Sequence, residues 1–570
     1  EKWIEIYKKE ISKVYPQIDE KKVKKVAKNN NISTMLARLI LARNVAEDDV
    51  SSFLNFDLKN IKDPYLIKDM EIFVNRVLKA KENNEKVCIY GDYDVDGITS
   101  ITIMYKFFKS IGIDVDYYLP DRLIEGYGVN NLALDEIKKR GCSLVITVDC
   151  GITAINETEY AKSLGMDMCI TDHHECADVL PDSVCIINPK QKDDKSSFKY
   201  HAGVGVAFKC LMALAIRLGL DSNSYLRYLD IVAVGTISDI VSLTDENRVI
   251  SKLGLDKIKD TENVGLKTLL QLIDFKDLDS TMVSFGIAPR INACGRMGNA
   301  KLAVELLLEN DEEKAYKLAL RLNELNVKRQ EIEKEIFDSA IKYIEENKID
   351  KKASIVLYNE NWHNGVIGIV ASRLVNLYYK PVILLTKEQG VVRGSGRCPS
   401  GFSLYNDLTD SKECLIQFGG HELAAGLSLE ESKINNFINK FEEVIQNKYK
   451  EEAKQIIDID SQIKINDLNA SLLKDISKLK PFGQCNPKPV FLYKGLKVES
   501  IRTLKEDKHL KMTLRDGKFL IDALCFGQGN RRDEVVVSDK IDIVCNVEIN
   551  NFGNKKTIQF ILIDFKKSVD

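Results

Sequence analysis

The sequence lacks the features of a membrane, secreted or zinc-ribbon protein. No apolar run approaches the roughly 18 residues of a membrane helix; stretches such as CLMALAI at 210–216 are far shorter. The first ten residues, EKWIEIYKKE, are charged without an apolar stretch, so we expect no secretion signal. The 13 cysteines are odd in number and none is at CxxC spacing, which argues against a disulfide framework and a zinc ribbon. We expect reduced thiols in a reducing cytoplasm.

The chain also has little net charge. Lys and Arg number 82 and Asp and Glu 85, so the formal charge is −3 and any nucleic-acid-binding surface must be local. Apolar residues make up 44% and charged residues 29%, the balance of a globular protein. A length of 570 residues corresponds to about three or four domains.

The order of the patterns along the chain predicts an α/β protein with a C-terminal β domain. From Lys86, short apolar runs alternate with amphipathic helices, which predicts a parallel sheet with helices on both faces. A charged helical stretch and a second α/β pattern follow, and the last part has short alternating strands typical of a small antiparallel barrel or sandwich. The predicted divisions are a helical segment at 1–75, a first α/β domain at 76–310, a helical linker at 311–350, a second α/β domain at 351–452 and the β domain at 453–570.

Three carboxylates, Asp92, Asp94 and Asp96, lie in the motif GDYDVDG directly after an apolar strand. On an extended backbone this spacing would point them the same way. Such clustering is costly unless something neutralises it, and a divalent cation does so best. DxDxDG also opens an EF-hand loop, but that loop needs a preceding helix and a Glu at its twelfth position, where this chain has Ile103.

Two further apolar strands end in similar groups. Asp149 follows LVITV, and Asp172-His173-His174 follows MCIT; Asp239, after an apolar segment, is a fourth candidate. An isolated Asp at a strand end is usually a cap or turn residue, but three such ends at one sheet edge indicate a site. Carboxylates with one or two imidazoles suit Mn²⁺ or Mg²⁺ better than zinc. This many carboxylates predicts two ions, which would clamp the oxygens of a phosphoryl displacement.

Some arginines lie among small residues, where they could hold phosphate bidentately. The candidates are Arg290 and Arg296 in APRINACGRMG, Ser395 and Arg397 in GSGR, and Arg122 in PDRLIEGYG. For any one of them a surface ion pair is the alternative. His421 follows two glycines, and a functional and a structural role are equally favoured for it. We interpret His201, His363 and His509 as structural.

Together these motifs resemble one family. GDYDVDG, TVDCG, DHH and GTISD, in this order, resemble the DHH phosphoesterases, and WHNGVIGIVASRL, GSGR and FGGHELAAG resemble the DHH-associated domain. PDRLIEGYGVN, HAGVGVAFK, FGIAPRINACGRMG and KPFGQCNPKPVF are similar to the RecJ family of bacterial single-strand-specific DNA exonucleases. The resemblance covers about residues 75–565. DHH alone would be weak evidence, but the ordered set is specific.

The resemblance implies a role for each matching residue. The implied metal ligands are Asp94, Asp96, Asp149, His173 and Asp239. The implied catalytic residues are Asp149 and His174, with His174 at the scissile phosphate as acid and Asp172 supporting the site. The implied substrate contacts are nucleotide phosphates for Arg290 and Arg296, the terminal 5′ phosphate for Arg122, Ser395 and Arg397, and the substrate in general for His421. Departures from the family pattern are small. Cys294 and Cys398 replace an expected Ala or Ser, and Ser238 an Ala.

The implied function is a metal-dependent 5′→3′ exodeoxyribonuclease. It would hydrolyse single-stranded DNA to 5′-mononucleotides with two Mn²⁺ or Mg²⁺ ions, in DNA recombination and repair in the bacterial cytoplasm. The implied partners are single-stranded DNA, single-strand-binding protein and a repair helicase, without a membrane, and we expect a monomer. The C-terminal unit would be an OB fold whose lysines alternate with Phe482 and Tyr493 as stacking platforms, while we expect Phe491 in its core.

Two alternatives stay open. One is a DHH phosphodiesterase for short oligonucleotides or cyclic dinucleotides, against which the strand-gripping third domain argues. The other is a non-catalytic replication scaffold. The complete set of metal-binding residues argues against that interpretation.

Overall fold

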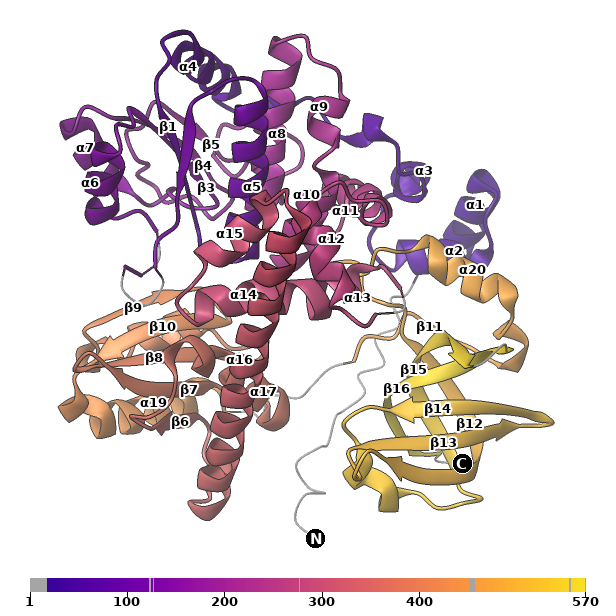
Figure 1. The fold of residues 1–570 in the computed structure, drawn as a ribbon. Helices are drawn as coiled ribbons and strands as arrows, with labels where there is room; N and C mark the ends of the chain where they lie inside the picture. Colours follow the sequence, from indigo (N-terminus) through magenta and orange to yellow (C-terminus); the bar gives the residue numbers. More distant parts are fainter. Residues whose placement is uncertain are drawn as a thin grey trace.

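The computed structural model describes residues 18–121, 125–126, 128–275, 277–450, 457–552 and 555–568. The sheet that carries the acidic motifs has five strands, and Figure 1 shows it among the helices of the first part of the chain. In spatial order the strands are β2 (Val115–Tyr118), β1 (Val87–Gly91), β3 (Leu144–Val148), β4 (Asp167–Thr171) and β5 (Cys185–Ile187). All neighbouring pairs are parallel. This confirms the predicted sheet and places the carboxyl ends of its strands at one edge.

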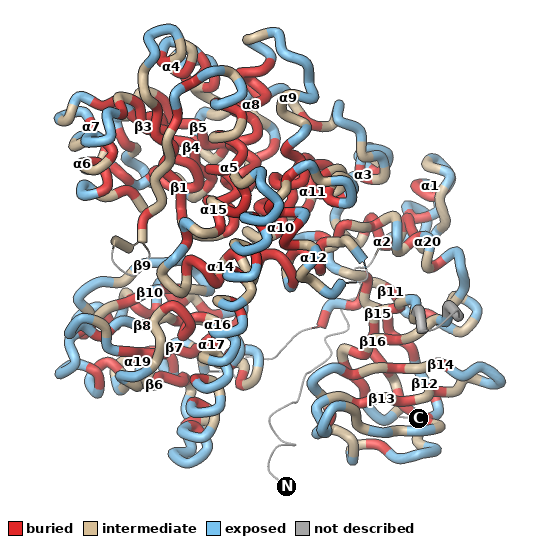
Figure 2. Tube along the Cα trace, in the orientation of Figure 1, coloured by how far each residue is buried: buried red, intermediate tan, exposed pale blue. Residues whose placement is uncertain are grey.

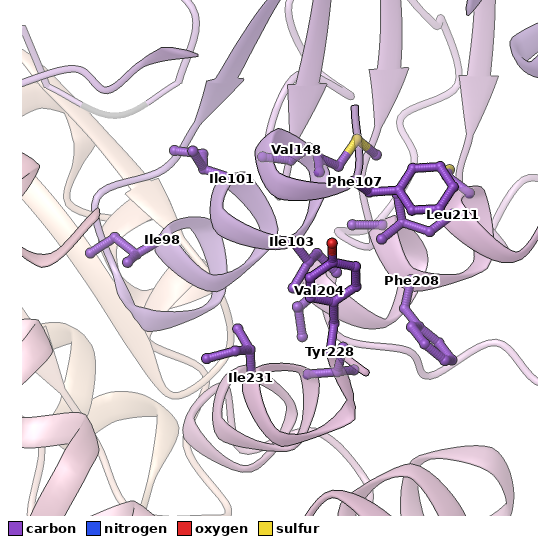
Figure 3. Packing of buried hydrophobic residues seen from close by; sticks show 14 of the residues in the cluster. Ile98, Ile101, Ile103, Phe107, Val148, Val204, Phe208, Leu211, Tyr228 and Ile231 are labelled. Carbon is purple, nitrogen blue, oxygen red and sulfur yellow. The ribbon is translucent and has the colours of Figure 1, made fainter. Parts of the chain in front are cut away.

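Helices cover both faces of this sheet, as predicted. One face packs against α4 (Met70–Glu82), α5 (Val95–Ser110) and α8 (Gly203–Arg217), with α10 (Leu229–Ser238) behind them; the other packs against α6 (Asn131–Lys139) and α7 (Ile155–Ser163). In the core, Phe107 of α5 lies near Leu211 of α8, and Ile231 of α10 closes the cluster (Figure 3). Helix α5 begins at the acidic loop, so this packing fixes the loop.

A long helix joins the two α/β parts. The helices before it are α9 (Asn223–Leu226), α11 (Asp245–Ile258), α12 (Val264–Gln271), α13 (Ser280–Met282), the π-helix Val283–Ile287, α14 (Ala288–Arg296) and α15 (Lys301–Leu308). The joining helix, α16 (Glu312–Glu346), buries Ala319 and Leu322 in the first core and Ala340 and Ile344 in the second. Its charged side chains are mostly exposed (Figure 2).

The second α/β part has a mixed sheet. Its strand order is β6 (Ile355–Tyr358), β7 (Val382–Glu388), β8 (Val391–Arg397), β10 (Ala424–Leu429) and β9 (Gln417–Gly420). Only the pair β6–β7 is parallel. Helix α17 (Asn364–Tyr378) covers one face together with α16, and α18 (Leu404–Thr409) and α19 (Ile434–Lys448) cover the other.

The C-terminal part is a closed five-stranded barrel. The ring runs β12 (Phe491–Leu504), β13 (His509–Asp516), β14 (Phe519–Cys525), β16 (Lys555–Lys567), β15 (Lys540–Phe552) and back to β12. The short β11 (Ser461–Gln462) adds to β12, and α20 (Ala470–Lys478) precedes the barrel. The expectation of a fully antiparallel sheet is wrong, because β14 and β16 are parallel. An odd number of strands cannot alternate in direction around a closed ring.

The N-terminal helices pack beside the C-terminal part. Helices α1 (Glu20–Asn30), α2 (Thr34–Leu41) and α3 (Val50–Leu54) share one apolar cluster with α20 and the barrel, and α2 and α20 lie side by side (Figure 1). Ser33 Oγ donates to Asp475 Oδ2 of α20 (2.5 Å). Segments more than 400 residues apart in the sequence thus form one unit.

All 13 cysteines are free thiols, and 11 of them are buried. Within the described ranges, no helix combines the length and the apolar character that a membrane span requires.

Candidate active site

The acidic loop changes from strand to helix directly after β1. Asp94 is the N-cap of α5, and its Oδ1 accepts hydrogen bonds from the backbone N–H groups of Asp96 (2.9 Å) and Gly97 (3.1 Å). The extended backbone on which this spacing would align the three carboxylates does not occur here, because the helix begins at Val95. Capping favours this start, because the carboxylate satisfies N–H groups that would have no partner in the first turn.

Asp96 is held by the start of a second helix. Its Oδ2 accepts from Gly203 N (2.6 Å) and its Oδ1 from Val204 N (2.7 Å), at the N-terminus of α8. Burial raises the pKa of Asp96 to about 7, and the charge of Asp94 acts in the same direction, against these two backbone donors. The two backbone donors thus fix the carboxylate in place.

Asp149 enters the site through an unusual backbone conformation. It follows β3 with φ +59°, in the left-handed region that Asp tolerates better than most residues. Its Oδ1 lies 3.0 Å from His173 Nε2. A Cβ on Gly203 would lie 2.6 Å from the Cβ of Asp149, so the close approach of α8 requires glycine there. Burial and the neighbouring carboxylates raise the pKa of Asp149 well above its usual value.

Asp172 organises the segment that follows β4. The carboxylate accepts from Ile152 N (2.9 Å), from the backbone N–H groups of His173 and His174, and lies 2.7 Å from His174 Nδ1. Burial opposes its charge, yet the hydrogen bond to His174 and the two imidazoles outweigh burial and lower the pKa of Asp172 to about 2. Burial is the largest single effect and lowers the pKa of His174, but Asp172 together with the charges of Asp96 and Asp92 raises it more, so the net shift is upward.

His173 faces carboxylates from three directions. Besides Asp149, its Nε2 lies 3.6 Å from Asp239 Oδ2 and 3.8 Å from Asp96 Oδ2. Burial lowers the pKa of His173 to about 3, and the backbone of His201 hydrogen-bonds the ring. Since Nε2 has no hydrogen-bond partner, that bond uses Nδ1. The neutral ring therefore directs a lone pair at the carboxylates.

The donor atoms around His173 fit a divalent cation. Asp149 Oδ1, His173 Nε2 and Asp239 Oδ2 are all buried without a hydrogen bond. Burial and the charges of Asp96 and Asp94 raise the pKa of Asp239 to about 9. Such a cluster is costly unless a cation compensates the charge, and carboxylate oxygen with imidazole suits a hard divalent ion.

Three groups of donor atoms could each hold an ion, with all atoms of a group within 4.8 Å of one another. They are Asp92, Asp94 and Asp149; Asp96, His173 and Asp239; and Asp149, His173 and His174. The structure thus brings all five implied metal ligands together at the sheet edge. Asp149 belongs both to the group with Asp92 and Asp94 and to the group with His173 and His174, so its carboxylate lies beside both sets of donor atoms.

A series of close contacts links this centre to the second α/β part. Cβ atoms added to Gly295 and Gly365 would lie 2.7 Å from Tyr93 O and 2.3 Å from Arg296 O, so neither position has room for a side chain. Arg296 Nη1 donates to Gly365 O in the first turn of α17 (3.2 Å). Arg296 therefore lies at the junction of the two parts.

The other arginine cluster adjoins the same helix. A Cβ on Gly368 of α17 would lie 2.8 Å from Ser395 Oγ and 3.2 Å from Arg397 Nη2. Arg397 Nη1 donates to Ser395 Oγ (3.2 Å). The hydroxyl and the guanidinium thus adjoin the amino-terminal part of a 15-residue helix, which favours anions.

Arg290, His421 and Arg122 are the remaining candidates. Arg290 donates to Asn323 Oδ1 of α16 (3.0 Å) and to Gly286 O (2.7 Å). His421 is exposed at the turn between β9 and β10, where it lines a hollow of about 420 Å³ with Tyr405 and Asn406. Arg122 lies outside the described residues.

The barrel surface differs from the prediction. Tyr493 is buried in the core and bonded to Asp516, so it is no stacking platform, and Phe491 is buried as expected. Lys511 and Arg515 form ion pairs with Asp522 and Glu499. Exposed rings belong instead to Phe519 (48%) and Phe526 (58%).

Three contributors to the site are absent from the roles that the resemblance implies. Asp92 joins one donor group, the backbone of His201 holds the His173 ring, and Gly203 supplies an N–H to Asp96. Asp92 could have been assigned from its place in GDYDVDG. Backbone donors and acceptors carry no sequence signal beyond the glycines of HAGVG.

Comparisons with known proteins agree with this geometry. Profiles described as "DHH family, N-terminal domain", "DHHA1 domain" and "RecJ OB domain" match residues 86–236, 351–447 and 459–564. The "Single-stranded-DNA-specific exonuclease RecJ" of Bacillus subtilis is 38% identical over 553 residues, 96% of this chain and 70% of that protein. The protein of the same name from Haemophilus influenzae is 32% identical over 566 residues, 95% and 98% of the two chains. The crystal structure of RecJ with Mn²⁺ from Thermus thermophilus matches with a TM-score of 0.85 at 28% identity, over 97% of this chain and 79% of that one.

Proposed function

The chain belongs to the RecJ family of single-stranded-DNA-specific exonucleases, and we propose that the acidic cluster at the sheet edge is its catalytic centre. The observation that carries this assignment is the convergence of Asp149, His173 and Asp239, whose buried donor atoms have no hydrogen-bond partner among the described residues and suit a cation. The centre binds Mn²⁺ or Mg²⁺, the ions named for the Thermus thermophilus structures with TM-scores of 0.85 and 0.79.

The ligands we assign are Asp94, Asp96, Asp149, His173 and Asp239, with Asp92 as an addition from the structure. Two ions held by these residues would lower the pKa of a bound water and offset the negative charge of the phosphate. Asp96 and His173 are held in place by Gly203, Val204 and His201, so they need no reorganisation when substrate arrives.

His174 donates the proton that the leaving oxygen needs. Asp172 bonds His174 Nδ1, which leaves Nε2 as the donor atom and stabilises the protonated ring. Arg296 and Arg290 hold nucleotide phosphates. Ser395 and Arg397, with Arg122, hold the terminal 5′ phosphate, which sets the 5′→3′ direction of digestion and gives 5′-mononucleotides.

The barrel binds the strand beyond the active site. Phe519 and Phe526 offer exposed rings on which bases can stack without sequence preference. His421 contacts the substrate from the second α/β part. The protein acts as a monomer in the bacterial cytoplasm, where its 13 thiols stay reduced. Its partners are single-strand-binding protein and a repair helicase, during DNA repair and recombination.

The direct test is digestion of a long single-stranded DNA labelled at its 3′ end, with Mn²⁺. The wild type should give a ladder that shortens from the 5′ side, with no products from blunt duplex. Asp149→Ala should lose at least about a hundredfold in rate, since even supporting residues of metal sites cost 10–100-fold. Asp178→Ala, at a carboxylate whose side chain is 94% exposed, is the matched control.

Other outcomes would favour other functions. Hydrolysis of a dinucleotide but not of the long strand would indicate a small-substrate phosphodiesterase. A folded wild type that binds Mn²⁺ but cleaves neither substrate would indicate a scaffold.

A further inference from the structure

The motif KPFGQCNPKP lies far from the metal centre in sequence, yet it contacts the connection that carries Asp239. Asp239 ends α10, and α11 begins at Asp245. Between them, Leu243 N donates to Gln484 O (2.9 Å), and Leu243 is buried. A Cβ on Gly483 would lie 2.6 Å from Leu243 Cδ1, so the two segments are in close contact.

The connection itself is strained. Ile240, the residue after Asp239, has φ +59°, a conformation that a β-branched residue rarely adopts. Its side chain is 71% exposed, so its own packing does not hold it there. Strained residues persist only where the surrounding structure over-determines them. The bonds downstream of Ile240, from Leu243 to Gln484 and from Asn247 Nδ2 to Ser242 O (3.0 Å), supply this constraint.

The loop that meets Leu243, residues 479–487, is itself fixed from two sides. Ser280 Oγ of the first α/β part donates to Phe482 O (2.7 Å). The buried Asn486 side chain donates to Leu479 O (2.8 Å) and Pro481 O (2.7 Å) within the loop.

A buried arginine completes this joint. Arg248 of α11 donates to Leu479 O (2.7 Å) and Lys478 O (3.1 Å), and its guanidinium lies 3.9 Å from the centre of the Phe53 ring. Contacts with Ser280, Leu243 and Arg248 thus fix the 479–487 loop against the first α/β part.

We infer that the 479–487 loop is a positioning element for Asp239: through Gly483 and Gln484 it holds the strained connection in the conformation that directs Asp239 toward His173. This inference rests on the proposed function only in taking Asp239 as a metal ligand. It gives the C-terminal part a role in the chemistry, besides its role in strand binding.

The test uses the full-length chain, freed of metal, and calorimetric titration with Mn²⁺ alone. Gly483→Val adds atoms against Leu243 and should weaken Mn²⁺ binding roughly tenfold, the effect typical of residues that orient ligands. The double variant Gly483→Val with Leu243→Ala removes the clash and should recover most of the affinity. Cys485→Asn is the matched control in the same loop, because Cys485 is exposed at φ +60°, a backbone conformation that Asn accepts.

Digestion of a long single strand gives the second measurement. In Gly483→Val, kcat should fall with Mn²⁺ affinity while KM for the strand changes less than about twofold. Unchanged Mn²⁺ affinity with a raised KM would overturn the inference, as would a double variant no better than Gly483→Val. If Gly483→Val does not fold, Ser280→Ala, which removes only the bond to Phe482, should shift Mn²⁺ affinity in the same direction. If the wild type binds Mn²⁺ without cleaving DNA, the proposed function fails, but the titrations still test the loop.

Discussion

At the scale of single residues, the site shows how environment separates chemically similar groups. Asp172 accepts several hydrogen bonds and its pKa falls to about 2, whereas Asp239 Oδ2 has no hydrogen-bond partner among the described residues, and burial with the neighbouring carboxylates raises the pKa of Asp239 to about 9. Both are aspartates at the end of an apolar segment, so the sequence cannot distinguish them. Hydrogen bonding to the charged form decides their roles.

Asp172→Asn should change the pH dependence of the nuclease. In the proposed mechanism the protonated form of His174 is the acid, so activity should be present below its pKa and lost as the pH rises through it. Asp172 raises that pKa, so its neutralisation should move the alkaline decline of kcat to lower pH. A pH–rate profile at saturating Mn²⁺ measures the shift.

Glu175→Gln is the control for this profile. Glu175 is 74% exposed and pairs with Lys190, so its neutralisation should leave the alkaline decline in place. A lower rate in Asp172→Asn with an unmoved profile would mean that His174 does not titrate in the catalytic step.

At the scale of elements, close helix packing sets where the metal-binding residues lie. Helix α11 crosses α10 at Gly254, where a Cβ would lie 2.2 Å from Leu229 O and 2.4 Å from Ala233 Cβ. Since α10 ends at Asp239, the depth of this contact determines how far that carboxylate reaches.

Gly254→Ala should destabilise the protein although alanine is the better helix former. The propensity gain is about 1 kcal/mol, but the added methyl meets backbone, and overpacking costs about 1–3 kcal/mol or more. Denaturant unfolding should show a net loss, and Mn²⁺ titration a weaker site. Asp256→Ala, exposed on the same helix, should stay within about 0.5 kcal/mol of the wild type. A more stable Gly254→Ala would show that α10 can move away.

At the scale of the whole molecule, the two ends of the chain form one unit. Helix α2 and the barrel share an apolar cluster, and Arg43 donates to Asn486 Oδ1 (2.9 Å) and pairs with Asp460. The predicted divisions at 1–75 and 453–570 stay predictions, as do the monomer and the partner proteins. This packing, however, makes the first and last segments interdependent.

Ile40→Ala should therefore loosen the C-terminal part. Ile40 is fully buried, so its truncation should cost about 2–5 kcal/mol. Hydrogen exchange should accelerate in α20 while β1 and β3 keep their protection. Lys24→Ala, exposed on α1, is the control. Equal acceleration in β1 would show that the molecule opens as a single cooperative unit.

The parallel sheet and the family could be predicted from the sequence, and the resemblance named the five proposed ligands that the structure brings together. Asp149 and His173 could be placed because parallel strands carry their ends to one edge, so a position after a strand is already a position in space. Arg296 and Ser395 could be selected by composition, since small residues beside an arginine are a local signal. Gly203 and the backbone of His201 could not, because main-chain groups are the same at every position.

Only the tertiary structure decided which distant segments meet. The pairing of α2 with α20 and of Leu243 with Gln484 joins residues hundreds of positions apart, and nothing local specifies such a contact. Likewise, the barrel buries Tyr493 and exposes Phe526, although both are aromatic residues in strand-rich sequence. Register and closure settle which side of a strand faces the core, and they depend on every strand of the ring at once.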